Sequence, residues 1–313
     1  MKNKPLKIFL RWLLCAVIIF IAFWFVLPPL NLRSSTLWGF LVFCIAVCAV
    51  INSLPRLSEA LSGFSGMKRI PYASDYKGAL KKTGKPFKIA LIAVLCIIVL
   101  NIAAWLSGAE IFNASRYVNL ITPEDGDFTA DVAEINRSQI PVVDRDTASR
   151  LGQRKLGEMS DLVSQFVIEE DYTQINYKGK PVRVTPLTYG DIIKWFNNQS
   201  EGIPAYISVD MTTQETTLVR LEDGIKYSKG EFFLRNLDRC LRFKYPTKIF
   251  DNISFEIDEN GTPYWVASCV GFKIGIWSGR DIDGAVLLNA VTGESEYYAL
   301  DDIPSWVDQV YSS

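Results

Sequence analysis

Three long stretches of the chain carry no charged side chain and are filled almost entirely with apolar residues. They cover about residues 12–30, 35–54 and 89–108. A helix needs about 20 such residues to cross the hydrocarbon core of a bilayer. Because no polar face interrupts any of the three runs, they differ from the buried helices of a soluble core. The pattern therefore predicts an all-α membrane part of three transmembrane helices within residues 1–109.

The basic residues around these runs predict an orientation. Four Lys or Arg residues precede the first run, only Arg33 lies between the first and second, and eight lie in residues 56–88. Basic residues in short flanks mark the cytoplasmic side. The N-terminus and residues 56–88 are then inside, and everything after residue 109 is outside. The first run is longer than the apolar core of a signal peptide and lacks a small-x-small cleavage site, so we interpret it as a retained anchor.

Residues 56–88 form a basic loop with two interpretations. The loop can lie on anionic lipid as a retention signal, or it can dock a cytoplasmic partner. Its glycines argue against a rigid fold, and it lacks the interleaved aromatic residues typical of nucleic-acid binding. We therefore expect the lipid bilayer as a partner and no nucleic acid.

After a linker at residues 110–143, the pattern changes to short helices alternating with groups of strands. Helical periodicity predicts helices at about residues 144–159, 188–199, 229–243 and 304–311. Short β-favouring runs separated by turn residues lie between them, at about residues 164–170, 172–179, 180–187, 203–210, 215–221, 253–258, 263–270, 285–291 and 295–300. Helices followed by antiparallel strands indicate an α+β domain over residues 144–313.

Two of the expected helices have apolar residues at helical spacing, which predicts a face that packs on a sheet. In the helix at residues 188–199 this face consists of Ile192, Ile193, Trp195 and Phe196. In the helix at residues 229–243 it consists of Phe233, Leu234, Leu237, Cys240 and Leu241.

A faint internal repeat lies within this domain. The segment that begins at Val209 aligns with the segment that begins at Leu288, so that Asp210 matches Asn289 and Thr213 matches Thr292. Each is read as a strand that ends in Asp or Asn, a turn, and a returning strand. Gly293 suits a turn position with positive φ, whereas Gln214 in the first copy is expected not to need one.

The second copy resembles the PepSY family of small extracytoplasmic domains. The resemblance is carried by Tyr245-Pro246, the strand ISFEIDENGTPYWV and the segment NAVTGESEYY. Here Asn289 replaces the usual aspartate, and the insert at residues 268–283 is longer than usual. The units would cover about residues 187–222 and 229–301. The resemblance implies a binding or inhibitory role and no catalytic residues. The whole chain also resembles uncharacterised membrane proteins of anaerobic Gram-positive bacteria.

The chain has no histidine, which excludes Ser-His-Asp and Cys-His catalysis and His-ligated zinc. Acidic clusters lie at residues 169–171, 256–259 and 301–302. They are expected to be turn or solvent-facing charges; calcium binding and carboxylate-based glycoside chemistry are the alternatives. We expect no catalytic residue, no metal and no cofactor.

Three further sets of residues are candidates. Cys240 and Cys269 are the cysteines outside the apolar runs, and they either form a disulfide or pack as core thiols. Trp277, Gly279 and Arg280 belong to a Gly-rich aromatic loop that suits partner binding. Asn101, inside the third run, is expected to form a polar contact with another helix.

These observations predict a multi-pass protein of a bacterial cytoplasmic membrane. Its net charge of −1 hides a split, since residues 1–107 carry 13 basic and 2 acidic residues and the remainder carries 20 and 32. The function expected is non-enzymatic binding, inhibition or scaffolding, with an envelope protein or wall polymer held by residues 144–313. The alternatives are a subunit of a transport or secretion assembly and a carboxylate-based envelope hydrolase.

Overall fold

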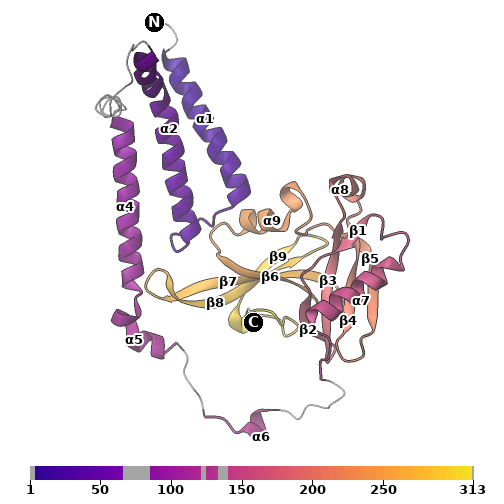
Figure 1. Ribbon diagram of the computed structural model, residues 1–313. Coiled ribbons are helices and arrows are strands. Elements are labelled where there is room, and N and C mark those ends of the chain that lie inside the picture. Colours follow the sequence, from indigo (N-terminus) through magenta and orange to yellow (C-terminus); the bar gives the residue numbers. More distant parts are fainter. Residues whose placement is uncertain (1–3, 66–84, 121–124, 133–139, 312–313) are drawn as a thin grey trace. The chain divides into compact units, whose positions relative to one another are not determined.

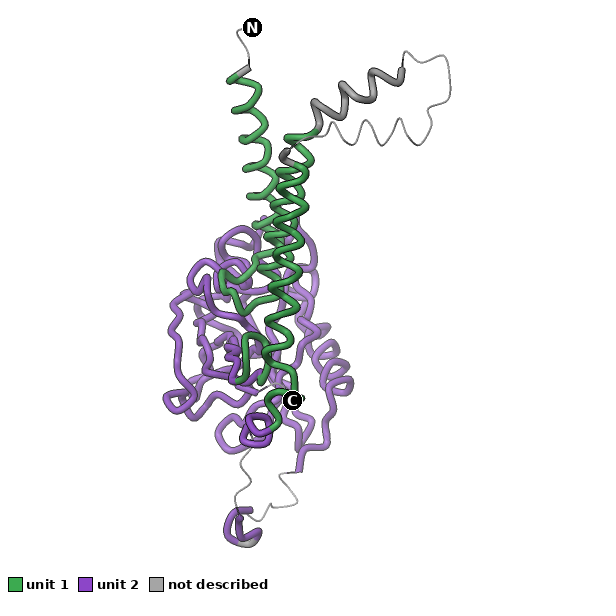
Figure 2. Tube along the Cα trace, turned by 90° about the vertical axis from the view of Figure 1, so that its left-hand side faces the viewer, with its two compact units in different colours: residues 1–114, 274–279 green, residues 115–273, 280–313 purple. Residues whose placement is uncertain are grey.

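The computed structural model describes residues 4–65, 85–120, 125–132 and 140–311. Most of the basic loop predicted at residues 56–88 and part of the predicted linker lie outside these residues. The chain divides into two compact units, coloured separately in Figure 2. One comprises residues 1–114 with 274–279, and the other comprises residues 115–273 with 280–313.

The first unit contains three helices that are long and apolar enough to cross a membrane, which confirms the three predicted helices. They are α1 (Lys4–Val26), α2 (Ser35–Ser65) and α4 (Lys85–Ser107). Their apolar segments cover Pro5–Val26, Ser35–Ser53 and Phe87–Ser107. The first helix ends earlier than predicted, because Leu27 has a φ of 47° and Pro28 and Pro29 follow it. The orientation inferred from the basic residues stays a prediction.

The predicted linker contains two short helices. They are α5 (Glu110–Val118), which is kinked at Asn113, and α6 (Phe128–Asp131). α5 buries no residue, so this segment contributes little to either hydrophobic core.

The second unit is built on two antiparallel sheets (Figure 1), and this confirms the α+β class. In the first sheet the strand order is β1-β3-β4-β5, and β2 also pairs with β3. In the second sheet the order is β6-β7-β8-β9. The strands are β1 (Phe166–Ile168), β2 (Thr173–Tyr177), β3 (Lys180–Tyr189), β4 (Ile203–Asp210), β5 (Thr216–Ile225), β6 (Phe250–Ile257), β7 (Pro263–Ile274), β8 (Ser278–Asn289) and β9 (Ser295–Ala299).

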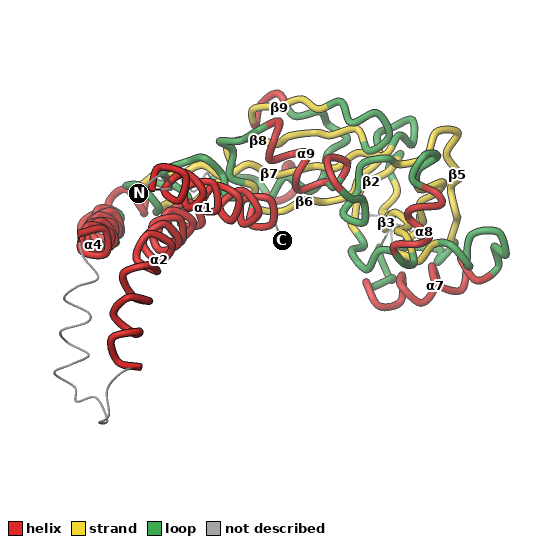
Figure 3. The backbone as a smooth tube through the Cα atoms, turned by 90° about the horizontal axis from the view of Figure 1, so that it is seen from above, coloured by secondary structure: helices red, strands yellow, loops and turns green. Residues whose placement is uncertain are grey.

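Side-chain caps fix where the helices of this unit begin. Asp144 accepts a hydrogen bond from the Thr147 amide at 2.7 Å and starts α7 (Arg145–Gly157). Asp191 does the same for α8 (Ile192–Asn198). Figure 3 shows α7 beside the first sheet. Ala148, Gly152 and Leu156 are buried on this helix, at the spacing of one helical face.

One hydrophobic core is shared by both sheets. Tyr206 of the first sheet and Phe255 of the second have ring centroids 6.0 Å apart, and Phe255 meets Trp265 edge-on at 5.3 Å. Aromatic pairs at these separations add to the stabilisation that burial provides. The two sheets therefore form one folded domain, the sheet domain.

The helix predicted at residues 229–243 is shorter than expected. It begins only at Leu237 (α9, Leu237–Lys244), because Asn236 accepts a hydrogen bond from the Arg239 amide and caps it there. Before it lies the 3-10 turn η2 (Phe233–Arg235). Phe233 has a φ of 52°, which no right-handed helix contains. Phe233 and Leu234 are therefore exposed rather than part of a buried face.

The apolar face predicted for the helix at residues 188–199 is also wrong in part. Trp195 is buried, but Ile192, Ile193 and Phe196 are exposed. Because successive residues are about 100° apart on a helix, Trp195 lies at one edge of this set, and α8 turns only that edge toward the core.

Three further expectations are corrected. The helix predicted at residues 304–311 is absent; only the 3-10 turn η3 (Leu300–Asp302) lies nearby. The insert predicted at residues 268–283 continues β7 and begins β8, so it is a long hairpin rather than a loop. Gln214 has a φ of 65° and Gly293 a φ of 77°, so both turns need a left-handed residue.

Candidate binding cleft

A cleft of about 530 Å³ in the sheet domain gathers charged and amide side chains from five segments of the chain. Arg145 begins α7, Arg183 lies on β3, Asn252 and Ser254 lie on β6, and Gln309 comes from the C-terminal segment. Asp171, Tyr172, Thr173, Gln174 and Ile253 complete its lining. The cleft is thus built from residues far apart in sequence, and only the folded domain can form it.

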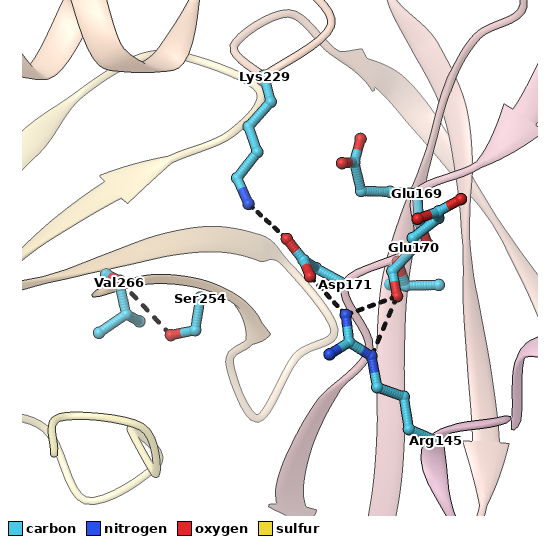
Figure 4. A network of polar contacts seen from close by, with 8 residues as sticks. Arg145, Glu169, Glu170, Asp171, Lys229, Ser254 and Val266 are labelled. Carbon is cyan, nitrogen blue, oxygen red and sulfur yellow. Dashed lines mark hydrogen bonds and ion pairs between the residues drawn. The ribbon is translucent and has the colours of Figure 1, made fainter. Parts of the chain in front are cut away.

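Asp171 is held between two cations at one side of this cleft (Figure 4). Its carboxylate accepts from Arg145 at 2.6 Å and from Lys229 at 2.9 Å. The hydrogen bond from Lys229, followed by that from Arg145, lowers the pKa of Asp171 even though burial opposes this shift. Asp171 therefore stays ionised and positions the two cations.

The other members of this acidic cluster do not share the pairing of Asp171. Burial raises the pKa of Glu169, and the positive charge of Lys229 only partly offsets it. The carbonyl oxygen of Glu170, rather than its carboxylate, accepts from Arg145 at 3.1 Å. Figure 4 shows Glu169 and Glu170 beside the Asp171 pair. Asp171 thus acts as a structural partner of the two cations.

Arg183 is the cation of the cleft whose hydrogen bonds go to uncharged oxygens. It donates to the carbonyl of Val143 at 3.3 Å and to the side-chain oxygen of Gln174 at 3.4 Å. Burial lowers the pKa of its guanidinium, the negative charge of Asp144 raises it, and the positive charge of Arg145 lowers it again, although arginine remains protonated in proteins.

Glu256 lies behind the cleft, fully buried, and binds the C-terminal segment to the second sheet. It accepts from the amides of Asp308 at 2.9 Å and Gln309 at 3.1 Å, and from the Ser254 hydroxyl at 3.1 Å. Burial raises the pKa of Glu256 to about 7, although these hydrogen bonds oppose the shift. The expectation that the cluster at residues 256–259 faces solvent is therefore wrong for Glu256.

A second cavity, of about 580 Å³, lies beside the hairpins of the predicted repeat. Asp210 Oδ1 accepts from the amides of Thr212 and Thr213, and Asn289 Oδ1 accepts from those of Val291 and Thr292. The residue four positions later donates its amide to the Asp210 or Asn289 carbonyl in each turn. The two turns therefore have the same local hydrogen-bond pattern.

The cysteines and the aromatic hairpin were candidates from sequence. Cys240 and Cys269 are free thiols buried in the shared core, and burial raises the pKa of Cys269 to about 12. Trp277 lies at the turn between β7 and β8, where Gly275 and Gly279 have φ values of 58° and 59°. Arg280 pairs with Asp251. None of these residues lines the cleft.

Asn101 hydrogen-bonds within its own helix instead of across to another. Its side-chain nitrogen donates to the Ile97 carbonyl at 2.7 Å. It also lines a cavity of about 420 Å³ between α2 and α4, with Trp38, Gly39 and Val42 on the facing helix. The donor of the amide is thus satisfied locally, which differs from the predicted interhelical contact.

Sequence reasoning missed Arg145, Arg183 and Ser254. Arg183 stands in the alternating run KPVRVTPL, where a polar residue on a strand ordinarily faces solvent. The same holds for Glu256, which alternates with Phe255 and Ile257 and would ordinarily face solvent, whereas this end of β6 is buried on both faces. Which strands would face one another was not readable from any of these patterns.

Comparisons with protein-family models, with curated proteins and with solved structures give no significant match to this chain. Among the described residues, no group of three or more Cys, Asp or Glu side chains is arranged to hold a metal ion.

Proposed function

We propose that this protein is a membrane-anchored, non-enzymatic binding, inhibitory or scaffolding module whose cleft holds a carboxylate-bearing segment of an envelope protein or wall polymer. The observation that carries this proposal is Arg183. Its guanidinium lines a cleft of about 530 Å³ and forms long hydrogen bonds to uncharged oxygens.

The chemistry of the lining favours a carboxylate over a neutral ligand. Guanidinium presents planar donors that match the two oxygens of a carboxylate, and charge-assisted bonds are stronger than neutral ones. Gln174 and Asn252 add amide groups that can bond to a peptide backbone or to sugar hydroxyls. Asp171 is already paired with Arg145 and Lys229. The negative charge of Asp144 acts on Arg183, but among the described residues the two form no ion pair, so the guanidinium can still bind a carboxylate.

Two further parts of the proposal concern the location of the sheet domain and its relationship to a domain family. The distribution of basic residues supports a sheet domain outside the cytoplasmic membrane of a bacterium. The matching turns at Asp210 and Asn289 support a relationship to PepSY domains, which would imply a binding or inhibitory role. Both fit a protein that displays a binding site close to the membrane.

Site-specific photo-crosslinking in cells tests the proposal. A photoreactive residue at Asn252, which is exposed and lines the cleft, should capture a defined envelope component. The same residue at exposed Thr217 on β5 should not capture it. Arg183→Gln should abolish the capture at Asn252, and Arg183→Lys should retain part of it.

Arg154→Gln is the matched control, since it removes one positive charge from an exposed position on α7 outside the cleft lining. Capture that is equal at Asn252 and Thr217, or that persists in Arg183→Gln, would overturn the proposal. Release of a cleaved product instead of a stable adduct would favour an enzyme.

A second candidate, a subunit of a transport or secretion assembly, is favoured by the cavity between α2 and α4. Asn101 and Trp38 place polar groups beside this otherwise apolar space, and helix-lined cavities of this kind receive partner helices or small molecules. Loss of cellular function in Asn101→Leu, with cleft variants unaffected, would select this candidate.

A further inference from the structure

The sheet domain exposes an apolar patch that the binding cleft does not use. Five of its side chains are between 61% and 69% exposed, and Phe232 is 39% exposed. The apolar patch consists of Ile192, Ile193 and Phe196 on α8 with Phe232, Phe233 and Leu234 at η2. Large apolar side chains gathered on a surface mark a site of interaction, whereas scattered ones do not.

Two segments of the chain form the apolar patch, and Trp195 holds them together. The ring of Trp195 lies 4.7 Å from that of Phe232 and 6.2 Å from that of Phe233. Phe196, the next residue on α8, meets Trp195 at 6.4 Å. The exposed side chains of the apolar patch thus pack against the buried ring of Trp195.

A buried carboxylate fixes this support. Glu231 is 3% exposed and accepts from Trp195 Nε1 at 2.8 Å and from the Tyr189 hydroxyl at 2.7 Å. Arg235 donates to the Gln199 carbonyl at 2.6 Å and so ties η2 to the end of α8. Both oxygens of Glu231 are satisfied, as a buried charged group requires.

The backbone at Phe233 is held in a costly conformation. A bulky residue with a φ of 52° is a rare outlier, and it persists only where the surrounding structure enforces it. This backbone conformation leaves the side chains of Phe233 and Leu234 exposed, and α9 does not extend back to Phe232. Such an outlier in an exposed aromatic turn points to an interaction of the turn and not to packing.

Basic residues outnumber acidic ones beside the apolar patch. Lys194 lies between Ile193 and Trp195 on α8, and Arg235 and Arg239 follow Leu234, with Asp238 between them. Asp191 caps α8 and faces Lys194 at 3.7 Å. Long cationic side chains beside an apolar surface can reach phosphate groups while their stems stay in the apolar region.

A bilayer is always within reach of this domain. The chain carries three helices long and apolar enough to span one, and residues 108–144 connect the last of them to α7. A tether raises the effective concentration of a second contact, so that even a weak interaction becomes populated. A separate protein partner would have no such advantage.

We propose that the apolar patch docks the sheet domain onto the interfacial layer of the same bilayer, with Ile193, Phe196 and Phe233 inserted among the lipids. Insertion of this kind reaches about 5–10 Å into the boundary between headgroups and acyl chains. Docking fixes one face of the domain against the membrane, and the binding cleft then has a defined direction. The proposal does not depend on the ligand of the cleft.

Lipid quenching on the full chain in nanodiscs tests the docking. The nanodiscs contain phosphatidylcholine with about one-third phosphatidylglycerol, since anionic lipid attracts basic segments. The cysteines of the spans are replaced by alanine, and a fluorophore is attached through Phe233→Cys, Ile193→Cys or, as control, Thr217→Cys. We expect quencher-bearing lipids to remove about half of the fluorescence at the first two positions and almost none at Thr217, given the insertion depth above.

Two observations would overturn the docking. If iodide in the water quenches the labels at positions 193 and 233 but quencher-bearing lipids do not, the apolar patch faces solvent. If neither quencher reduces the fluorescence, and only in nanodiscs that hold several copies of the chain, a second copy covers the apolar patch. Because these side chains are exposed, their substitution leaves the core intact, and Phe196→Ser should reduce lipid quenching at Phe233→Cys without changing the circular dichroism of the chain.

Discussion

Gly152 of α7 lies directly against the hydroxyl of Tyr172. A β-carbon built on Gly152 would be 2.1 Å from Tyr172 Oη and 3.2 Å from the δ-carbon of Ile168. The hydroxyl is buried without a hydrogen-bond partner among the described residues, and burial raises the pKa of Tyr172 to about 12. The packing of α7 on the first sheet thus depends on a glycine inside a helix.

This contact reverses the usual effect of a glycine substitution. Gly to Ala within a helix ordinarily stabilises by about 1 kcal/mol. Here the added carbon overlaps a rigid phenol, and overpacking of this kind costs about 1–3 kcal/mol. We expect Gly152→Ala to lower the thermal unfolding midpoint of the sheet domain, measured by tryptophan fluorescence in detergent. In the Tyr172→Phe background, which lacks the overlapping oxygen, the same substitution should cost clearly less. An equal loss in both backgrounds would contradict the assignment of the clash to the hydroxyl.

The elements of the fold were largely readable from hydrophobic periodicity, because helices and strands repeat at different intervals. The three apolar helices and the nine strands overlap the predicted ones, although β8 begins seven residues before the predicted residue 285. The start of α7 was readable to within two residues, since Asp144 and Asp146 are both possible cap residues before the helical pattern, and the structure selects Asp144. These features depend on short stretches of sequence, and so one sequence suffices to find them.

Features that depend on tertiary contacts were not readable. The segment around Phe233 has helical spacing, yet Asn236 starts the helix later and the Ser228 carbonyl accepts the Leu237 amide at 3.0 Å. The last segment has helical spacing too, but Glu256 binds the backbone amides of Asp308 and Gln309, and the segment is not helical. In both cases a distant polar group outweighed local propensity.

The cleft was not readable for the same reason. Arg183 and Gln174 belong to one hairpin, whereas Asn252 belongs to the other sheet. Only the packing of the two sheets brings them together, and no spacing rule encodes that packing. The acidic cluster at residues 169–171 was noticed, but its role depends on Arg145 and Lys229, which are 26 and 58 residues away from Asp171.

The hairpin turns give a second prediction. Burial disfavours the charged form of Asp210, but the hydrogen bonds from Thr212 and Thr213 outweigh it and lower its pKa to about 2. The folded-state pKa lies below the usual value of 3.8, so the stability contributed by Asp210 is present above about pH 4 and lost as the pH falls toward 2. Asp210→Ala should cost about 1 kcal/mol at neutral pH, as the loss of a capping bond does.

Asn289→Ala is the matched control for this turn, because Asn289 makes the same backbone bonds without a titrating group. It should cost a similar amount, but its cost should not change between about pH 2 and pH 5. Chemical unfolding of each variant over that range measures the difference. A pH-independent cost for Asp210→Ala would show that the carboxylate does not stabilise the turn in its ionised form.

The orientation of the chain gives a third prediction. The basic flanks predict that residues 56–88 lie in the cytoplasm and residues 144–313 outside. A membrane-impermeant maleimide should label Thr217→Cys in intact cells, and Lys77→Cys only after the membrane is permeabilised. The unsubstituted chain is the control, since Cys240 and Cys269 are buried. The reverse labelling pattern would invert the topology and place the cleft in the cytoplasm.

The last prediction concerns Glu256, whose pKa in the folded chain is about 7, above its usual 4.5. A raised folded-state pKa means that the stability linked to this group is fully present below about pH 4.5 and is lost as the pH rises through 7. Ser254, Asp308 and Gln309 face the carboxylate, and the charge of Asp308 adds to the shift after burial. The C-terminal segment should therefore loosen from β6 at alkaline pH, and amide exchange of Asp308 and Gln309 should accelerate between about pH 6 and pH 8 by more than the intrinsic rise.

Glu256→Gln should remove this additional acceleration, since the amide cannot ionise. At low pH the carboxyl group of the parent chain is protonated and, like the amide, has one carbonyl oxygen as acceptor. Exchange at Asp308 and Gln309 should therefore be similar in the two chains at low pH, and in Glu256→Gln it should then follow the intrinsic pH dependence. Glu259→Gln, at an exposed position three residues away, removes the same charge outside the buried site and should leave the parent profile unchanged. If the parent chain and Glu256→Gln gave parallel profiles, the buried carboxylate would not be the group that couples the C-terminal segment to pH.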